Sequence, residues 1–231
     1  MISIMSKEKP SQRGDLVKRY DGLAKRLKIY MDDPKRNNQN YLWDGFGLIH
    51  NRILSMTEIL SDYYRKWNVF LEKNPSVSDE IITKEIFGRI TTVTTWCFIS
   101  VFSGIEFTIK NIIKDSVRNE FLELKQDLID GKQVYLEDII KKSSVSNIVV
   151  DEDLPKWIAL IKLRNIFVHN NGYPDSDKLH EPIKKHFTHF KKNEMITGPY
   201  DNFFTFTEML VTLYESWSKK YRDENTSNDI F

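Results

Sequence analysis

Residues 162–172 read KLRNIFVHNNG and join three polar side chains to an abrupt change of backbone direction. Arg164, Asn165 and His169 are followed directly by Asn-Asn-Gly. Glycine, and to a lesser degree asparagine, adopts the left-handed conformation that ends many helices. The stretch therefore predicts a helix that ends beside an arginine and a histidine five positions apart.

The residues before this stretch extend the same helix toward the N-terminus. Asp151 or Asp153 can cap its start, and Pro155 then falls in the first turn, where the missing N–H of proline costs no hydrogen bond. Its buried face is expected to consist of Trp157, Ile158, Leu160, Ile161 and Phe167.

Few residues in the rest of the chain break helices. The 231 residues include only 9 Gly and 7 Pro, which leaves long uninterrupted segments. Apolar residues recur in these segments at three- and four-residue steps, the spacing of one helix face. Further helices are predicted at 15–31, 41–72, 78–114, 118–129, 136–142 and 203–221. The expected fold class is all-α.

These helices are expected to form one domain over residues 1–231. A chain of this length can bury a large core, and 13% aromatic residues supply it. The expected parts are a core at roughly 41–221, an N-terminal helix within 1–34, a small helical insertion at 117–150 and a frayed polar tail at 223–231.

The most apolar segment, 78–114, permits more than one interpretation. Residues 91–95 read TTVTT and have strand propensity, but the helical step of apolar residues continues beyond them. The window 91–109 is about long enough to cross a bilayer. It also carries Glu106 and several Thr and Ser, which favours a buried core helix. Gly104 is expected to allow another helix to approach closely.

The net charge indicates which partners the chain can attract, and the cysteine content indicates its cellular compartment. Lys+Arg 34 against Asp+Glu 33 gives +1, so no overall field attracts the chain to nucleic acid or membrane, and any basic surface is local. The single Cys97 excludes an intrachain disulfide and fits a reducing compartment. Residues 1–9 lack the apolar run of a signal peptide. We expect a soluble, cytoplasmic protein without a membrane partner.

Arg164 and His169 are residue types that can cleave a phosphodiester without a metal. A guanidinium can bind a phosphate through two parallel hydrogen bonds and stabilise a pentacoordinate transition state. Histidine exchanges protons near neutral pH, so it can take a proton from a ribose 2′-hydroxyl or give one to a leaving 5′-oxygen. Asn165 can orient either the imidazole or the phosphate. The alternative interpretation is a surface cation and a helix-capping residue.

The hexapeptide RNIFVH at 164–169 resembles the R-x(4–6)-H signature of HEPN domains. The following Asn170-Asn171-Gly172 extends the likeness to the RN-x-x-x-HN form common in HEPN proteins of phage-defence and toxin–antitoxin systems. The likeness in helical order covers about 41–221, whereas the specific motif covers only 163–172.

This resemblance implies an antiparallel helical bundle that forms a homodimer, with two Arg–His pairs facing one cleft. It also implies RNA cleavage without a metal or cofactor, giving 2′,3′-cyclic phosphate and 5′-hydroxyl ends. HEPN ribonucleases commonly add an acidic residue that supports the arginine, and Glu106 is the candidate. The expected catalytic residues are then Arg164, His169, Asn165 and Glu106. The alternative for Glu106 is an ordinary helix salt bridge to Lys110, four residues on.

The segment 178–192, KLHEPIKKHFTHFKK, interleaves cations with Phe187 and Phe190, a pattern that suits single-stranded RNA. The alternative is a solvated basic loop whose Phe side chains pack into the bundle. His186 and His189 have a spacing that can bind a metal, but no Cys or carboxylate cluster joins them, so no metal site is predicted. The expected RNA-binding residues are Lys110, Asn170, Lys184, Lys185, His186, His189, Lys191 and Lys192.

Two functions from different classes follow. The first is an endoribonuclease that cuts tRNA or another structured RNA in phage defence or as a toxin, with an antitoxin or regulatory protein as a further partner. The second is a non-catalytic helical module that binds RNA, a nucleotide or a partner protein. The enzyme needs Arg164 and His169 in a cleft that solvent reaches, whereas the module does not.

Overall fold

The computed structural model describes residues 13–32, 40–78, 85–86, 88–199 and 201–226. These residues are mostly helical and contain no strand, apart from one isolated bridge between His189 and Thr197, so the predicted all-α class is confirmed. The elements are α1 (Arg13–Met31), α2 (Asn40–Lys73), α4 (Gly88–Lys114), η4 (Asn119–Phe121), α5 (Leu122–Ile129), α6 (Leu136–Val145), α7 (Leu154–His169), α8 (Glu181–Lys184) and α9 (Asn202–Thr226).

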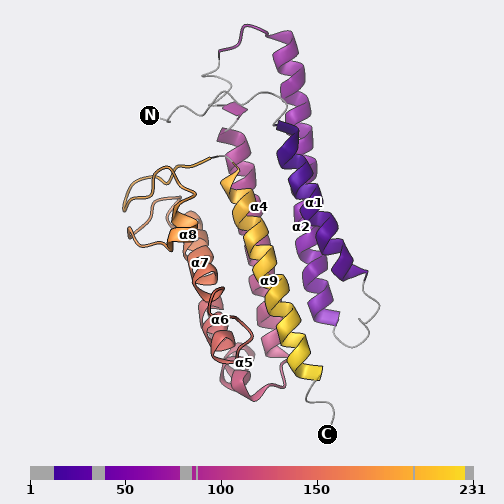
Figure 1. Cartoon of the computed structure of the whole chain (residues 1–231), viewed down its shortest axis with the longest axis vertical. Coiled ribbons are helices and arrows are strands. Elements are labelled where there is room, and N and C mark those ends of the chain that lie inside the picture. Colours follow the sequence, from indigo (N-terminus) through magenta and orange to yellow (C-terminus); the bar gives the residue numbers. More distant parts are fainter. Residues whose placement is uncertain (1–12, 33–39, 79–84, 87, 200, 227–231) are drawn as a thin grey trace.

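The helices are arranged around α4 (Figure 1). α1 and α2 form an antiparallel pair on one side, α9 runs beside α4 in the middle, and α5, α6 and α7 lie on the other side. α4 contacts α2, α7 and α9. The N-terminal half of α4 therefore lies near the C-terminal end of α7 and the start of α9, and these three meet at the candidate site described below.

The central helix is a core helix with one open side. The strand-prone residues 91–95 are helical within α4, and the part of its predicted start at 79–84 lies outside the described residues. α4 is the described helix that is long and apolar enough to cross a membrane by length and composition, and 44% of that stretch is buried within the bundle. Its open side carries two large exposed side chains, Trp96 and Phe107.

A glycine permits the closest packing in the core, but not the glycine that the sequence indicated. A Cβ on Gly45 of α2 would lie 2.3 Å from Thr108 Cγ2 of α4 and 2.5 Å from the Tyr214 hydroxyl of α9. A Cβ on Gly104 would meet the Arg52 guanidinium at an ordinary 3.4 Å. The expectation of close approach at Gly104 was therefore wrong, and Gly45 is the position where the three helices require glycine.

The predicted insertion at 117–150 contains the two expected short helices, α5 and α6. Ser143 of α6 is fully buried and accepts a hydrogen bond of 3.1 Å from Trp217 Nε1 of α9. The buried Phe121 packs at a tilt against Tyr221 of α9, with ring centres 6.3 Å apart. The segment therefore packs into the domain core instead of forming a separate appendage.

The start of α7 differs in detail from the prediction. Asp153 occupies the N-cap position but makes no capping hydrogen bond through its side chain. Its carboxylate instead accepts a hydrogen bond of 2.7 Å from Lys156 Nζ, one turn on. Pro155 lies in the first turn as predicted. The helix therefore begins where the sequence indicates but is stabilised there by an ion pair in place of a cap.

Candidate functional site

α7 ends as the Asn-Asn-Gly stretch predicts. The helix is regular through His169, and Asn171 (φ 51°) and Gly172 (φ 86°) both have the left-handed backbone. The N–H groups of Asn170 and Gly172 each donate to the Ile166 carbonyl at 3.1 Å. A tight reversal therefore fixes the end of the helix that carries Arg164 and His169.

Arg164 is held in place but keeps donors free. Its side chain is 22% exposed, and its guanidinium lies 5.9 Å from the Phe102 ring centre. Nη1 donates to Asn165 Oδ1 at 3.0 Å, while Nη2 lies 3.9 Å from Glu106 Oε2, beyond hydrogen-bond distance. The buried Nε has no hydrogen-bond partner among the described residues. Because Nε is closed to solvent, the donor available to an anionic ligand is Nη2, which makes no hydrogen bond.

Glu106 lies between two cations. Its Oε1 accepts a hydrogen bond of 2.7 Å from Lys110 Nζ, and its Oε2 faces Arg164 at the longer distance of 3.9 Å. Its side chain is 23% exposed, so it is not the buried carboxylate that an apolar run suggested. Both predicted contacts are therefore present, and the one with Lys110 is the tighter.

His169 does not face Arg164 within one chain. α7 is helical across both residues, which places their side chains about 140° apart around its axis. His169 is exposed, and none of the described residues makes a hydrogen bond to its ring. Asn165 lies one turn before His169 and bonds to Arg164, so it links the two faces. In a single copy, Asn165 therefore positions the arginine, and the imidazole is left open to solvent.

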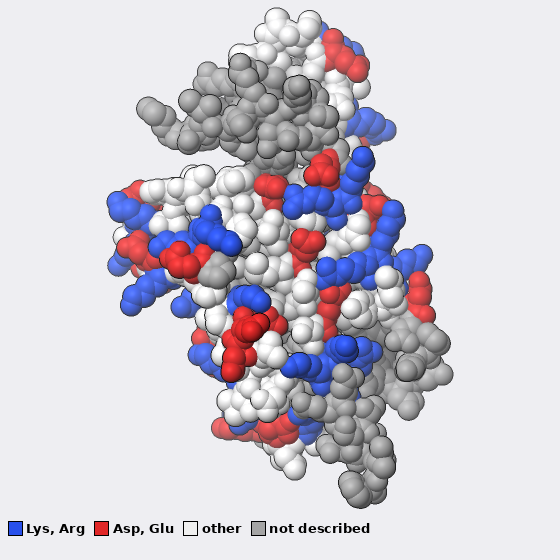
Figure 2. Space-filling view, viewed as in Figure 1, with Lys and Arg blue, Asp and Glu red and all other residues white. Residues whose placement is uncertain are grey.

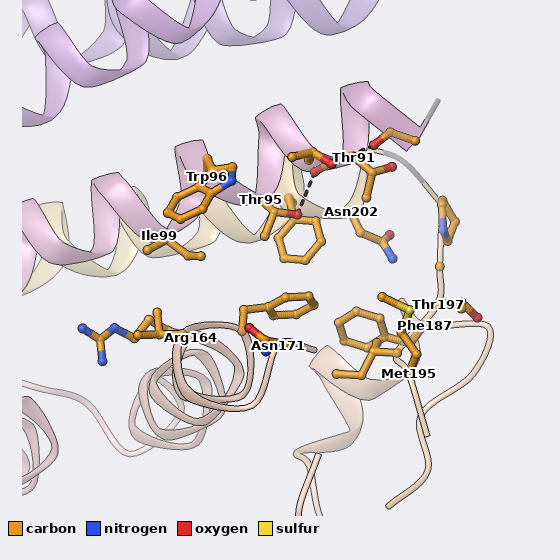
Figure 3. Close-up of a pocket in the computed structure, with 18 of the residues that line it drawn as sticks. Thr91, Thr95, Trp96, Ile99, Arg164, Asn171, Phe187, Met195, Thr197 and Asn202 are labelled. Carbon is orange, nitrogen blue, oxygen red and sulfur yellow. Dashed lines mark hydrogen bonds between the residues drawn. The ribbon is translucent and has the colours of Figure 1, made fainter. Parts of the chain in front are cut away.

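A cavity of about 730 Å³ opens next to Arg164. Its walls come from the N-terminal half of α4, the last turns of α7, residues 187 and 195–199, and the first residues of α9 (Figure 3). Trp96, Thr95 and Asn202 lie on one side, and Asn171, Phe187 and Met195 lie on the other. Arg164 lies at one end of the lining, and its guanidinium points away from the other labelled side chains.

The cavity was not predicted from the sequence. It is formed by three segments that are far apart in the chain, and the side chains on α4 belong to an apolar run without a visible face. The sequence contains Trp96 within that run, but it does not tell that this side chain is exposed, because its exposure depends on the positions of α7 and α9.

The basic segment after α7 forms a short helix, α8, and a turn closed by the bridge between His189 and Thr197. Phe187 and Phe190 are half-buried and pack against the hydrophobic core, and Phe187 also lines the cavity. Glu194, a residue outside 178–192, binds both His189 (2.8 Å) and Lys191. Part of the segment's charge is therefore neutralised locally.

The remaining predicted RNA-binding side chains have mixed surroundings. Lys185 and Lys192 are exposed, whereas Lys184 is half-buried and lies 3.9 Å from Glu181. Asn170 is exposed at the end of α7. His186 is half-buried edge-on against the Phe206 ring. Burial lowers the pKa of His186 below its usual 6.5, and the nearby Lys185 lowers it further, which favours the neutral imidazole at neutral pH.

Charges on the face shown in Figure 2 do not form a large basic surface. On the face in Figure 2, Lys and Arg side chains are interspersed with Asp and Glu. Within the described ranges, no three His, Cys, Asp or Glu side chains lie close enough together to hold a metal ion. Cys97 is fully buried, and burial raises the pKa of its thiol to about 12, so it is unsuited to act as a nucleophile at neutral pH.

Comparison with known proteins gives no relative. The chain matches no protein-family model, no curated protein sequence and no solved structure. The likeness to HEPN domains therefore depends on the residues of the motif and on the all-helical context in which they lie.

Proposed function

We propose that the protein is a metal-independent endoribonuclease of the HEPN type that acts on tRNA or another structured RNA. The observation that carries the proposal is the end of α7, where a half-buried guanidinium with unused donors lies two turns or less from an exposed imidazole. Asn165 and Glu106 contact the guanidinium and define its position.

In this mechanism Arg164 binds the scissile phosphate and stabilises the charge that develops on its oxygens. His169 takes the proton of the ribose 2′-hydroxyl, and the 2′-oxygen attacks phosphorus. The bond from phosphorus to the 5′-oxygen then breaks, and that oxygen takes the proton from the His169 imidazolium. The products are a 2′,3′-cyclic phosphate and a 5′-hydroxyl.

In this proposal a second copy of the chain supplies the histidine that acts together with Arg164 of the first copy. Arg164 and His169 diverge around α7, so one chain does not aim both groups at one phosphate. A twofold dimer that pairs the exposed ends of α7 brings the arginine of each copy toward the histidine of the other. This geometry supports a homodimer as the active form.

The biological setting follows by analogy with the family that the motif resembles. We propose a cytoplasmic enzyme that limits growth by cutting host RNA, in phage defence or under the control of an antitoxin. The same divergence of Arg164 and His169 supports the second candidate function, a non-catalytic helical module that binds RNA through Arg164.

The test is cleavage of labelled total tRNA by the full chain and by three variants. Arg164→Ala and His169→Ala are expected to abolish cleavage. His180→Ala, which removes an exposed histidine outside the α7 motif, is expected to keep it. Intact RNA with every protein, together with RNA binding that survives His169→Ala, contradicts the enzyme and favours the module.

A further inference from the structure

The cavity beside Arg164 has the size and lining of a site for an organic ligand. Its volume of about 730 Å³ lies within the range of about 300–1,000 Å³ of small-molecule pockets. Aromatic and apolar side chains make up most of its wall, and Arg164 at one end is its charged group. A ligand that fits this arrangement has a flat apolar body and an anionic group on one side.

Trp96 provides a stacking surface at the rim. Its side chain is 62% exposed, although an indole of this size normally lies in a core or an interface. The half-buried Phe187 lies on the opposite side of the same cavity. An exposed aromatic ring in a cavity that also carries an arginine is a usual platform for an unpaired base of a single-stranded nucleic acid.

Three hydroxyls on the α4 wall can accept hydrogen bonds, whereas the Trp96 indole N–H on the same wall is a donor. The hydroxyls of Thr92, Thr95 and Ser103 each donate to a carbonyl one turn earlier, at 3.0, 2.7 and 2.9 Å respectively. A hydroxyl has one proton, so the lone pairs of these oxygens remain for a ligand. Asn202 likewise donates its amide N–H to the His186 carbonyl, and its amide oxygen makes no hydrogen bond within the described ranges.

We propose that this cavity binds an unpaired nucleobase with an amino group at purine C6 or pyrimidine C4, adenine or cytosine, in preference to one with a carbonyl there, next to the phosphate bound by Arg164. Binding of the phosphate by Arg164 rests on the proposed ribonuclease function. Binding of the base is inferred from the hydroxyl oxygens of the α4 wall and from Trp96. An amino group donates to the oxygens of the wall, whereas a carbonyl at the same place faces other acceptors and leaves them unpaired.

The test is equilibrium binding of 2′-O-methyl hexanucleotides, which lack the attacking hydroxyl and therefore stay intact. The full chain is titrated against hexauridylate with one central adenosine, cytidine, inosine or uridine, followed by fluorescence anisotropy. The adenosine and cytidine oligomers are expected to bind about tenfold more tightly than the inosine and uridine oligomers. Inosine keeps the purine ring system of adenosine but has a carbonyl at C6 and an N–H at N1. The comparison therefore separates the hydrogen-bonding edge of the base from the size of its ring system.

Two exposed aromatic residues of α4 form a matched pair of variants. Trp96→Ala removes the stacking surface and is expected to weaken binding of the adenosine oligomer by about tenfold or more. Phe107→Ala removes an equally exposed ring, 61% against 62%, from the same open side of α4 but outside the cavity. It is expected to leave binding within about twofold of the wild type. Thr95→Val, which keeps the shape and removes an acceptor, is expected to reduce the preference for adenosine over inosine.

The outcomes separate this proposal from the ribonuclease proposal. Equal binding of the adenosine and inosine oligomers overturns the base site, even if the protein cuts tRNA. Selective binding of the amino-bearing oligomers supports the base site, even if tRNA stays intact. Equal weakening by Trp96→Ala and Phe107→Ala, with a change in sedimentation, also overturns the base site and assigns this side of α4 to contact between copies.

Discussion

Arg164 Nη2 lies 3.9 Å from Glu106 Oε2, while Lys110 binds the other oxygen of the same carboxylate at 2.7 Å. The carboxylate is therefore shared between two cations, and Arg164 is its weaker partner. A guanidinium that is oriented but not fully bonded can turn its donors toward a phosphate without first breaking a strong ion pair. This relationship distinguishes an arginine suited to binding from one committed to the fold.

Substitutions at Arg164 and at Glu106 are expected to lower the rate of RNA cleavage by different amounts. Arg164→Ala should lower the cleavage rate by about 100-fold or more, because it removes the charge opposite the transition state. Arg164→Lys should also be severely impaired, since an ammonium does not reproduce two parallel N–H donors. Glu106→Gln should lower the cleavage rate by only about fivefold or less, because the contact between Glu106 and Arg164 is long and partly exposed. Single-turnover rates on tRNA measure all three, and an inactive Glu106→Gln with an active Arg164→Lys contradicts this account.

Mixing two inactive variants tests whether the site is shared between copies. Arg164→Ala and His169→Ala are each expected to be inactive, but heterodimers formed by mild denaturation and renaturation of a mixture retain one arginine and one histidine. Because the two side chains diverge within one chain, the mixture should cut RNA well above either variant alone. If the heterodimer forms, as a tag-based pull-down shows, and stays inactive, the shared site is excluded.

The close crossing of α2, α4 and α9 predicts opposite effects for two glycine substitutions. Gly45→Ala places a methyl group 2.3 Å from Thr108 Cγ2, so it should lower the free energy of unfolding by about 1–3 kcal/mol. Gly22→Ala adds a methyl to the exposed surface of α1, where no atom lies within 4 Å, and should raise it by about 0.5–1 kcal/mol. Urea unfolding measures both, and equal effects would show that the helices are not packed as described.

Burial of His186 predicts a stability change on acidification. Its folded-state pKa lies below 6.5, so the unfolded chain binds the proton more readily once the pH falls below that value. The contribution of His186 to stability is therefore complete above pH 6.5 and is lost as the pH falls from there toward the lower, folded-state pKa. The wild type should lose more thermal stability between pH 7.5 and 5.5 than His186→Asn does. An equal loss of thermal stability in the two proteins contradicts a half-buried, neutral imidazole at position 186.

Much of the helical order follows from local sequence. The end of α7 at Asn171 and Gly172 depends on two residue types with low-cost left-handed conformations, and the structure confirms it. The two short helices near residues 122–145 were likewise predictable, because Gly131 separates two short apolar patterns. The divergence of Arg164 and His169 also follows from helix geometry, provided that the helix stays regular to its last residue.

The rest depends on contacts that the sequence does not encode locally. Gly45 and Gly104 look alike in sequence, and only the crossing of three helices separates the position that excludes a side chain from the one that tolerates it. Asp153 has the residue type of a cap, but Lys156 competes for its carboxylate. The cavity beside Arg164 needs α4, α7, residues 187 and 195–199, and the first residues of α9 together, so no single segment predicts it.

The most direct test of the central claim is the chemistry of the RNA ends. Purified wild type and His169→Ala are incubated with labelled tRNA in excess EDTA, and the termini of any fragments are identified by phosphatase and kinase treatment. We expect fragments from the wild type alone, with 2′,3′-cyclic phosphate and 5′-hydroxyl ends. Cleavage that EDTA abolishes, that leaves a 5′-phosphate, or that continues in His169→Ala would contradict the claim.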